Sequence, residues 1–186
     1  MTTVAIMRTK DKKEESELLA KDMGFEVRFA SPLELSELDS PDFWRFVDEL
    51  EAGLVSKVVV TSVSGLKFMI ALLNKRQKTS AVLRKLNEMG GILAIGPLTA
   101  EAARKEWIKV EALPEKFSAD GLAEMLRGRV RPGQKVWVLR SDKGSKVLTE
   151  GLQKAGSQVE EASVYTLRET NPDRALLDMY YWTIHG

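Results

Sequence analysis

The sequence contains no cysteine and only one histidine, His185, which lies beside the C-terminus. Without cysteine there are no disulfides, thiolate nucleophiles, thiolate metal ligands or iron–sulfur clusters. With a single histidine, we expect neither a Ser-His-Asp triad nor a histidine-rich zinc site. Any chemistry must therefore use hydroxyl groups, carboxylates, Lys or Arg side chains, a phenol or backbone amides.

The chain also lacks an excess of either charge and a long apolar run. The chain has 28 Lys and Arg residues and 27 Asp and Glu residues. Its net charge therefore gives no reason to expect binding to nucleic acid or to an anionic membrane. No stretch approaches the ~20 apolar residues that span a bilayer, and the short N-terminal run does not fit a signal peptide. We predict a cytoplasmic protein with no nucleic-acid or membrane partner. Neither a Walker A pattern nor a G-x-G-x-x-G fingerprint occurs, so a nucleotide ligand has no support.

The 186 residues, 44% of them hydrophobic, suffice for one large domain or two small ones. Short runs rich in Val and Ile alternate with segments of helical periodicity. This alternation predicts an α/β fold with a mainly parallel sheet. The predicted strands are Val4–Arg8, Glu26–Phe29, Lys57–Thr61, Ile92–Ile95, Val110–Ala112, Lys135–Leu139 and Gln158–Ala162.

Helical spacing of apolar residues fills the intervals between these strands. Four glycines follow helical runs and are expected to close them in the left-handed conformation, namely Gly24, Gly90, Gly128 and Gly156. Trp44, Trp107 and Trp137 are expected in the core. The predicted helices contain Leu18, Leu19 and Met23 on one face, Phe43 to Leu54, Leu66–Leu73, Ala81–Met89, Ala100–Trp107, Ala119–Leu126 (capped by Ser118) and Lys146–Ala155.

Two extended segments that end at prolines, Phe29–Pro41 and Val164–Pro172, resemble crossings between domains. We predict that they lie side by side as a hinge. The expected division is residues 1–28 for the first part of domain 1, 29–37 for one hinge segment and 38–163 for domain 2. Residues 164–172 then form the returning hinge segment, and 173–186 a shortened return into domain 1.

Three turns after predicted strands carry the candidate binding residues, because parallel sheets bind ligands at the carboxyl ends of their strands. Each turn leads into a helix, whose free N–H groups and dipole favour an anion. For any one turn, a simple helix cap is the alternative interpretation. Three turns together at one edge favour an anion-binding site, and a carboxylate is the expected anion. The candidates are Thr61, Ser62 and Ser64, then Gly96, Thr99 (a possible cap) and Ala100, then Arg140 and Ser141.

Arg8 and Arg140 end two predicted strands, and the planar guanidinium suits a carboxylate. Each could equally be a solvated residue at a strand end. Tyr165 follows the alternating run Val159–Val164 and could place a phenol in a cleft as a proton donor. The alternative for Tyr165 is an ordinary strand aromatic with a solvated hydroxyl.

The ordered series of motifs resembles the uroporphyrinogen-III synthase family over roughly the first 170 residues. The matching fragments are Val60-Thr61-Ser62, Ile95-Gly96-Pro97-Leu98-Thr99-Ala100-Glu101, Phe117-Ser118-Ala119-Asp120-Gly121-Leu122, Val138-Leu139-Arg140-Ser141-Asp142, Leu152 with Ala155-Gly156 and Val159, and Val164-Tyr165-Thr166. The resemblance implies two flavodoxin-like α/β domains joined by a two-segment hinge.

The resemblance also implies the reaction: cyclisation of the linear tetrapyrrole hydroxymethylbilane to uroporphyrinogen III. Water is lost, and the last pyrrole ring is inverted through a spiro intermediate. No metal and no organic cofactor is implied. The expected state is a monomer at full length, with association through exposed sheet edges as the alternative for this shortened chain. The substrate carries acetate and propionate groups on every ring. By this resemblance, Tyr165 matches the family's hinge tyrosine, which is proposed to assist departure of the hydroxyl. Thr61 with Ser62, and Thr99 with Ala100, match two turns that bind the substrate in the family.

The sequence departs from the family pattern after Tyr165, where a second Thr-Ser turn and a second Gly-Pro-x-Thr-Ala turn are expected and do not occur. We therefore expect a shortened chain with exposed sheet edges and weak or absent activity by itself. Two alternatives stay open. One is a flavodoxin-like module that binds a small carboxylate without catalysis, and the other is half of a split synthase.

Overall fold

The computed structural model describes residues 2–154 and 156–170. The chain divides into two compact units. The first contains the residues up to Ser36 together with those from Leu167 onward, and the second is Glu37–Thr166. The predicted shortened return at 173–186, the end of the second hinge segment and His185 lie outside the described residues. The division predicted from sequence places both crossings within a few residues of these boundaries, and their role as a hinge stays a prediction.

The first unit contains a small parallel βαβ arrangement. Strand β1 (Thr3–Met7) is followed by a 3-10 turn, η1 (Lys10–Lys12), helix α1 (Lys13–Asp22) and strand β2 (Glu26–Ala30), and β1 pairs with β2 in parallel. The helix at Leu18, Leu19 and Met23 is confirmed. However, these three side chains are more than 60% exposed, whereas the smaller Ser16 and Ala20 are buried.

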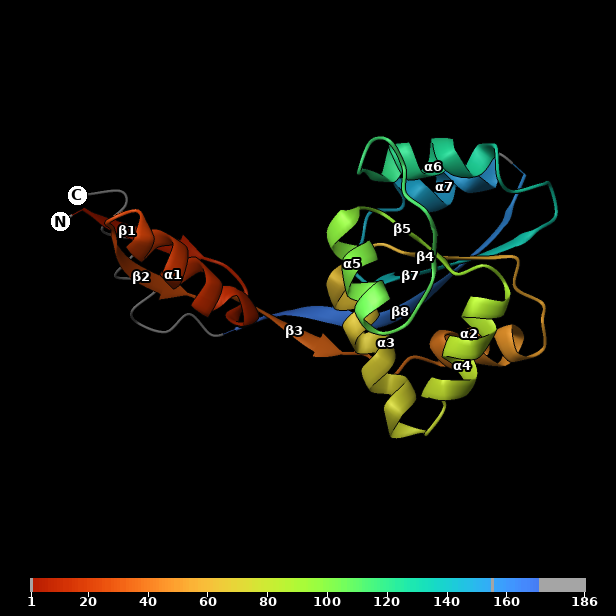
Figure 1. Ribbon diagram of the computed structural model, residues 1–186, viewed down its shortest axis with the longest axis horizontal. Helices are drawn as coiled ribbons and strands as arrows, with labels where there is room; N and C mark the ends of the chain where they lie inside the picture. The colour runs from red at the N-terminus through yellow and green to blue at the C-terminus, as the bar shows by residue number, and fades with distance from the viewer. Residues whose placement is uncertain (1, 155, 171–186) are drawn as a thin grey trace. The chain divides into compact units, whose positions relative to one another are not determined.

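The second unit, drawn in Figure 1, is built on a mainly parallel six-stranded sheet. The strand order is β3-β8-β7-β4-β5-β6, and the pairs from β8 to β6 all run in parallel. The predicted α/β fold with a parallel sheet is therefore confirmed. Its strands are β3 (Leu33–Glu37), β4 (Lys57–Val60), β5 (Ile92–Ala94), β6 (Val110–Ala112), β7 (Lys135–Ser141) and β8 (Gln158–Glu169).

Strand β3 is the one that sequence periodicity did not predict, because it lies within an expected crossing segment. It is the edge neighbour of β8. Thr170 N donates to Pro32 O at 3.0 Å in the first unit, and Leu38 N donates to Val164 O at 3.0 Å in the second. Residue numbers therefore rise along one segment as they fall along the other, so the two segments run antiparallel and share hydrogen bonds.

Helices cover both faces of the sheet. Helices α6 and α7 lie on one face and α2, α3, α4 and α5 on the other (Figure 1). On the α6–α7 face, Leu122, Leu126, Leu148 and Leu152 pack on Val138 and neighbouring strand residues in one apolar cluster. The helices are α2 (Pro41–Glu51), α3 (Val63–Lys75), α4 (Thr79–Glu88), α5 (Pro97–Lys105), α6 (Ala119–Arg127) and α7 (Val147–Lys154).

Two expectations about single residues were wrong. Trp137 is fully buried and Trp44 is half-buried, but Trp107 is 85% exposed. Helix α5 ends before Trp107, which takes φ +61° in the turn to β6, so its ring leaves the apolar face of the helix. Gly128 has φ −86° and does not close its helix in the left-handed region, unlike the other three glycines named above.

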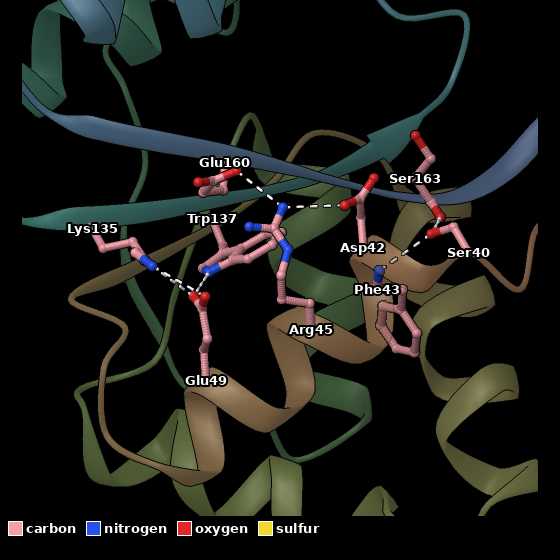
Figure 2. Close-up of polar contacts among 9 residues, drawn as sticks. All are labelled: Ser40, Asp42, Phe43, Arg45, Glu49, Lys135, Trp137, Glu160 and Ser163. Carbon is pink, nitrogen blue, oxygen red and sulfur yellow. Dashed lines mark hydrogen bonds and ion pairs between the residues drawn. The ribbon is translucent and has the colours of Figure 1, made fainter.

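Helix α2 is attached to the sheet by polar groups as well as by its buried Phe43, as Figure 2 shows. The fully buried Trp137 donates its indole N–H to Glu49 Oε2 at 2.9 Å, and Lys135 Nζ donates to the same carboxylate at 3.0 Å. Arg45 lies over the Trp137 ring, 4.9 Å from its centroid. A buried tryptophan needs a partner for its N–H, and Glu49 supplies it.

The carboxylate of Glu49 is stabilised in its charged form by these contacts. Burial would raise the pKa of Glu49, but the hydrogen bonds from Trp137 and Lys135, with the positive charges of Lys135 and Arg45, outweigh it and hold the pKa below the ordinary value of 4.5. A carboxylate with a lowered pKa in the folded state stabilises the protein above its unfolded pKa. That contribution is lost as the pH falls through the folded value.

We expect Glu49→Gln to lower the free energy of unfolding by about 1 kcal/mol at neutral pH, because the charge is removed from two hydrogen bonds. The deficit should shrink at an acidic pH below 4.5, as Glu49 of the unmodified protein also becomes protonated. Urea unfolding followed by tryptophan fluorescence at both pH values measures this. Glu101→Gln is the control, because its ion pair with Lys105 is exposed and its loss should have little effect on stability. An equal deficit at both pH values would contradict the assignment.

Candidate functional site

Strands β7, β4 and β5 run in parallel and end at the same edge of the second unit's sheet, and β8 lies parallel to β7 beside them. We call this edge, made by the turns that follow these strands, the carboxyl edge. In parallel α/β sheets ligands bind at this edge. It holds all the candidate site residues of the second unit, namely Thr61, Ser62, Ser64, Gly96, Thr99, Ala100, Arg140, Ser141 and Tyr165.

The turn between β4 and α3 is attached to the neighbouring strand. Thr61 donates from both its backbone N (3.4 Å) and its Oγ1 (3.3 Å) to the carbonyl of Leu139 on β7. Ser62 is the N-cap of α3, and its Oγ accepts from Gly65 N at 2.9 Å. Ser64 lies half-buried in the first turn of the helix. The cap interpretation of Ser62 is thus confirmed, and the Ser62 hydroxyl has a second partner besides.

That second partner is Tyr165. Its Oη lies 3.2 Å from Ser62 Oγ, and either hydroxyl can be the donor. The Tyr165 ring stacks on Phe68 of α3, with centroids 5.4 Å apart and planes at 17°. Tyr165 is only 9% exposed. The phenol is therefore fixed at its ring and at its hydroxyl, both from α3. Phe68 did not emerge from the sequence because it occupies an ordinary apolar position within a predicted helix.

The turn between β5 and α5 offers backbone groups rather than side chains. Gly96 is the N-cap, in extended conformation, and the helix has no side-chain cap. Thr99 was expected to cap this helix, but the helix begins two residues earlier, at Pro97, and the Thr99 side chain is 4% exposed. Ala100 is fully buried. The first-turn N–H groups and the positive end of the α5 dipole are therefore what this turn presents.

Arg140 has a structural partner in the same unit. Its guanidinium is 6% exposed, and Nη1 donates to Glu161 Oε1 at 3.0 Å. The same carboxylate oxygen accepts from the Thr149 hydroxyl. A Cβ added to Gly144 would lie 1.8 Å from Arg140 Nη2, so the guanidinium packs against the backbone of the following turn. This pairing favours a structural role for the guanidinium, and the predicted binding role of Arg140 stays a prediction.

Ser141 and the residues after it form a tight turn. Ser141 Oγ accepts from Lys143 N at 3.1 Å and donates to Asp142 Oδ1 at 3.3 Å. Asp142 N donates to the carbonyl of Tyr165 at 3.2 Å, and Thr166 Oγ1 donates to Asp142 Oδ2 at 2.9 Å. The end of β7 is thereby tied to the end of β8.

Arg8 belongs to the first unit, at the end of β1, so it is not one of the residues that the second unit brings together. Its Nη1 donates to the hydroxyl of the buried Ser16 at 3.0 Å, and its backbone N donates to Ala30 O. Within residues 2–154 and 156–170, no three His, Asp or Glu side chains lie close enough together to hold a metal ion. None of the helices in that part of the chain has the length and apolarity to cross a membrane.

The sequence model of a known family matches most of the chain. The family is described as "Uroporphyrinogen-III synthase HemD", and the match covers residues 13–179. The chain belongs to the uroporphyrinogen-III synthase family. A protein of Methanothermobacter thermautotrophicus named "Putative uroporphyrinogen-III synthase" is 27% identical over 181 residues, which are 94% of this chain and 67% of that protein.

Solved uroporphyrinogen-III synthases have the same fold. A mutant form of the Thermus thermophilus enzyme matches with a TM-score of 0.64 at 15% identity, over 91% of this chain and 64% of that one. The wild-type enzyme matches with a TM-score of 0.58 at 18% identity, over 97% and 66%. The Helicobacter pylori enzyme matches with a TM-score of 0.55 at 16% identity, over 82% and 61%. This chain thus spans slightly less than two thirds of the length of these structures.

We expect Ser62→Ala to lower the free energy of unfolding by about 1–2 kcal/mol, because α3 loses its cap and Tyr165 loses a hydrogen-bond partner. Ser118→Ala is the matched control: its Oγ accepts from Gly121 N at 3.1 Å as the cap of α6, so it should cost about 1 kcal/mol through the cap alone. Tyr165→Phe keeps the stack on Phe68 and should cost less than about 1 kcal/mol. Urea unfolding of the three variants measures these values. A larger loss for Tyr165→Phe than for Ser62→Ala would contradict this description.

Proposed function

We propose that this chain acts as a uroporphyrinogen-III synthase, closing the linear tetrapyrrole hydroxymethylbilane into uroporphyrinogen III with inversion of the last ring. The observation that carries the proposal is the phenol of Tyr165, held at the carboxyl edge by Ser62 and Phe68 among helix N-termini. Family membership supports the same reaction. A cytoplasmic location and a small-molecule substrate, with no nucleic-acid or membrane partner, are further parts of this proposal. The proposed state is a monomer at full length, with association through exposed sheet edges as the alternative for this shortened chain.

The substrate's carboxylates would bind to backbone amides. Helices α3, α5 and α7 all begin at the carboxyl edge, so their first-turn N–H groups and dipoles favour anions there. Helix α5 has no side-chain cap, which leaves its first-turn donors for a ligand. In this proposal Thr61, Ser62, Ser64 and Ser141 bind through hydroxyl or backbone groups. Gly96 and Thr99 bind through backbone N–H groups alone, because the Thr99 side chain is buried. The N–H of Ala100 already donates to Gly96 O at 3.1 Å, so Ala100 contributes only by closing the first turn of α5.

Tyr165 would act on the leaving hydroxyl. Its Oη donates a proton as the C–O bond of the hydroxymethyl group breaks, so that water leaves with the bonding electrons. The resulting electron-poor methylene is attacked by the terminal ring, the spiro intermediate opens and recloses, and the ring carbon that forms the final bond releases a proton. That proton restores the phenol, and the net loss is one water. Most of the acceleration would come from holding the two ends of the substrate together.

We expect Tyr165→Phe to lower kcat about tenfold, less than the 10²–10⁴ typical of a general acid, because positioning supplies much of the catalysis. The assay incubates the 186-residue chain with hydroxymethylbilane and separates the type I and type III isomers after oxidation. Asp48→Ala, which removes an exposed carboxylate on α2, should keep kcat and KM. Type I product alone from the unmodified chain would overturn the proposal, and binding without turnover would instead favour the carboxylate-binding module.

The anion site at α5 can be tested by charge. Leu98 lies in the first turn and is 73% exposed, so substitution there does not disturb the core. Leu98→Glu should raise KM for hydroxymethylbilane about tenfold through repulsion of its carboxylates, although a Glu in the first turn favours the helix itself. The neutral control Leu98→Gln should leave KM within about twofold. Equal KM values for the two variants would show that substrate carboxylates bind elsewhere.

A further inference from the structure

We propose that Asp142 is a positioning residue that aims Tyr165 into the site, an inference that rests on the proposed function. The starting observation is the pairing of β7 with β8. Arg140 is paired with Ser163, but the next residue, Ser141, is paired with Tyr165. One residue of β8, Val164, is therefore extra at this point, as in a β-bulge.

The bulge decides which face of the sheet Tyr165 occupies. Side chains alternate along a strand, so a one-residue shift in register moves a side chain to the opposite face. Without the shift, Val164 would be paired with Ser141, and Tyr165 would point to the face covered by α6 and α7. With it, the Tyr165 ring lies against α3, where Phe68 and Ser62 hold it.

Asp142 fastens the chain immediately beyond this bulge. Its backbone N donates to Tyr165 O at 3.2 Å, and its Oδ2 accepts from Thr166 Oγ1 at 2.9 Å. Its other oxygen, Oδ1, accepts from Ser141 Oγ at 3.3 Å. Asp142 therefore holds the main chain of Tyr165, the side chain after it and the end of β7.

The charge of Asp142 also argues for positioning rather than substrate binding. A carboxylate at an edge that binds carboxylates would repel the ligand, so Asp142 is unsuited to contact it. Both of its oxygens accept hydrogen bonds from hydroxyl groups of the protein. These hydrogen bonds explain the role of Asp142 as a positioning residue. Lys143, the next residue in the chain, supplies a compensating positive charge.

The experiment compares Asp142→Ala and Thr166→Val with the matched control Asp48→Ala, which removes an exposed carboxylate on α2. We expect each of the first two to lower kcat about tenfold with KM within twofold, because the phenol is misplaced. Together they should lower kcat no further than either alone. In a Tyr165→Phe background, Asp142→Ala should have no additional effect on kcat. Asp48→Ala should keep the unmodified kcat.

A second readout does not depend on turnover. The chain has three tyrosines, and Tyr165→Phe identifies which Cζ resonance in a tyrosine-labelled NMR sample belongs to Tyr165. Asp142→Ala should shift or broaden that resonance and leave the other two unchanged, with the chain still folded by circular dichroism. An unchanged Tyr165 resonance would overturn the inference.

The two proposals fail differently. If Tyr165→Phe lowers kcat but Asp142→Ala does not, Asp142 has no positioning role and the proposed function stands. If Asp142→Ala lowers kcat equally in the Tyr165→Phe background, Asp142 does not act through Tyr165. If the unmodified chain makes no type III isomer, the proposed function fails, and the NMR result alone decides whether Asp142 places the phenol.

Discussion

The parallel hydrogen bonding of β8, β7, β4 and β5 is the constraint on which the site depends. Parallel neighbours need crossover helices, so β7, β4 and β5 are each followed by a turn at one edge and a helix that starts there. Three turns are brought together without any one of them carrying an unusual sequence. Buried β-strand residues such as Val59, Val138 and Leu93, which touch no ligand, therefore determine where Thr61, Gly96 and Ser141 lie.

Much of this arrangement could be predicted from the sequence, because it depends on local patterns. The Val-rich strand at Lys57–Val60, the cap at Ser118 and the turn order after each strand follow from periodicity and side-chain chemistry. Family resemblance then added the reaction, which periodicity alone does not contain.

Long-range contacts were the part that could not be predicted. The burial of Arg140 depends on Glu161, which is 21 positions away, and on close approach of Gly144. The face of the sheet to which the Tyr165 side chain points depends on a β-bulge that no local sequence pattern predicts. Trp107 sits on a predicted apolar face, but a left-handed turn takes it out of the helix. In each case tertiary geometry overrode a correct local pattern.

The internal neutralisation of Arg140 has a consequence for how acidity affects ligand capture. With that guanidinium bound to Glu161, the groups that the proposed site presents to an anion are peptide N–H dipoles and hydroxyl groups, which neither gain nor lose protons across the physiological range. The affinity of these turns for a carboxylated ligand should then follow the ionisation of the ligand itself. Acidification would weaken binding by protonating the carboxylates of the ligand rather than by changing the charge of the protein.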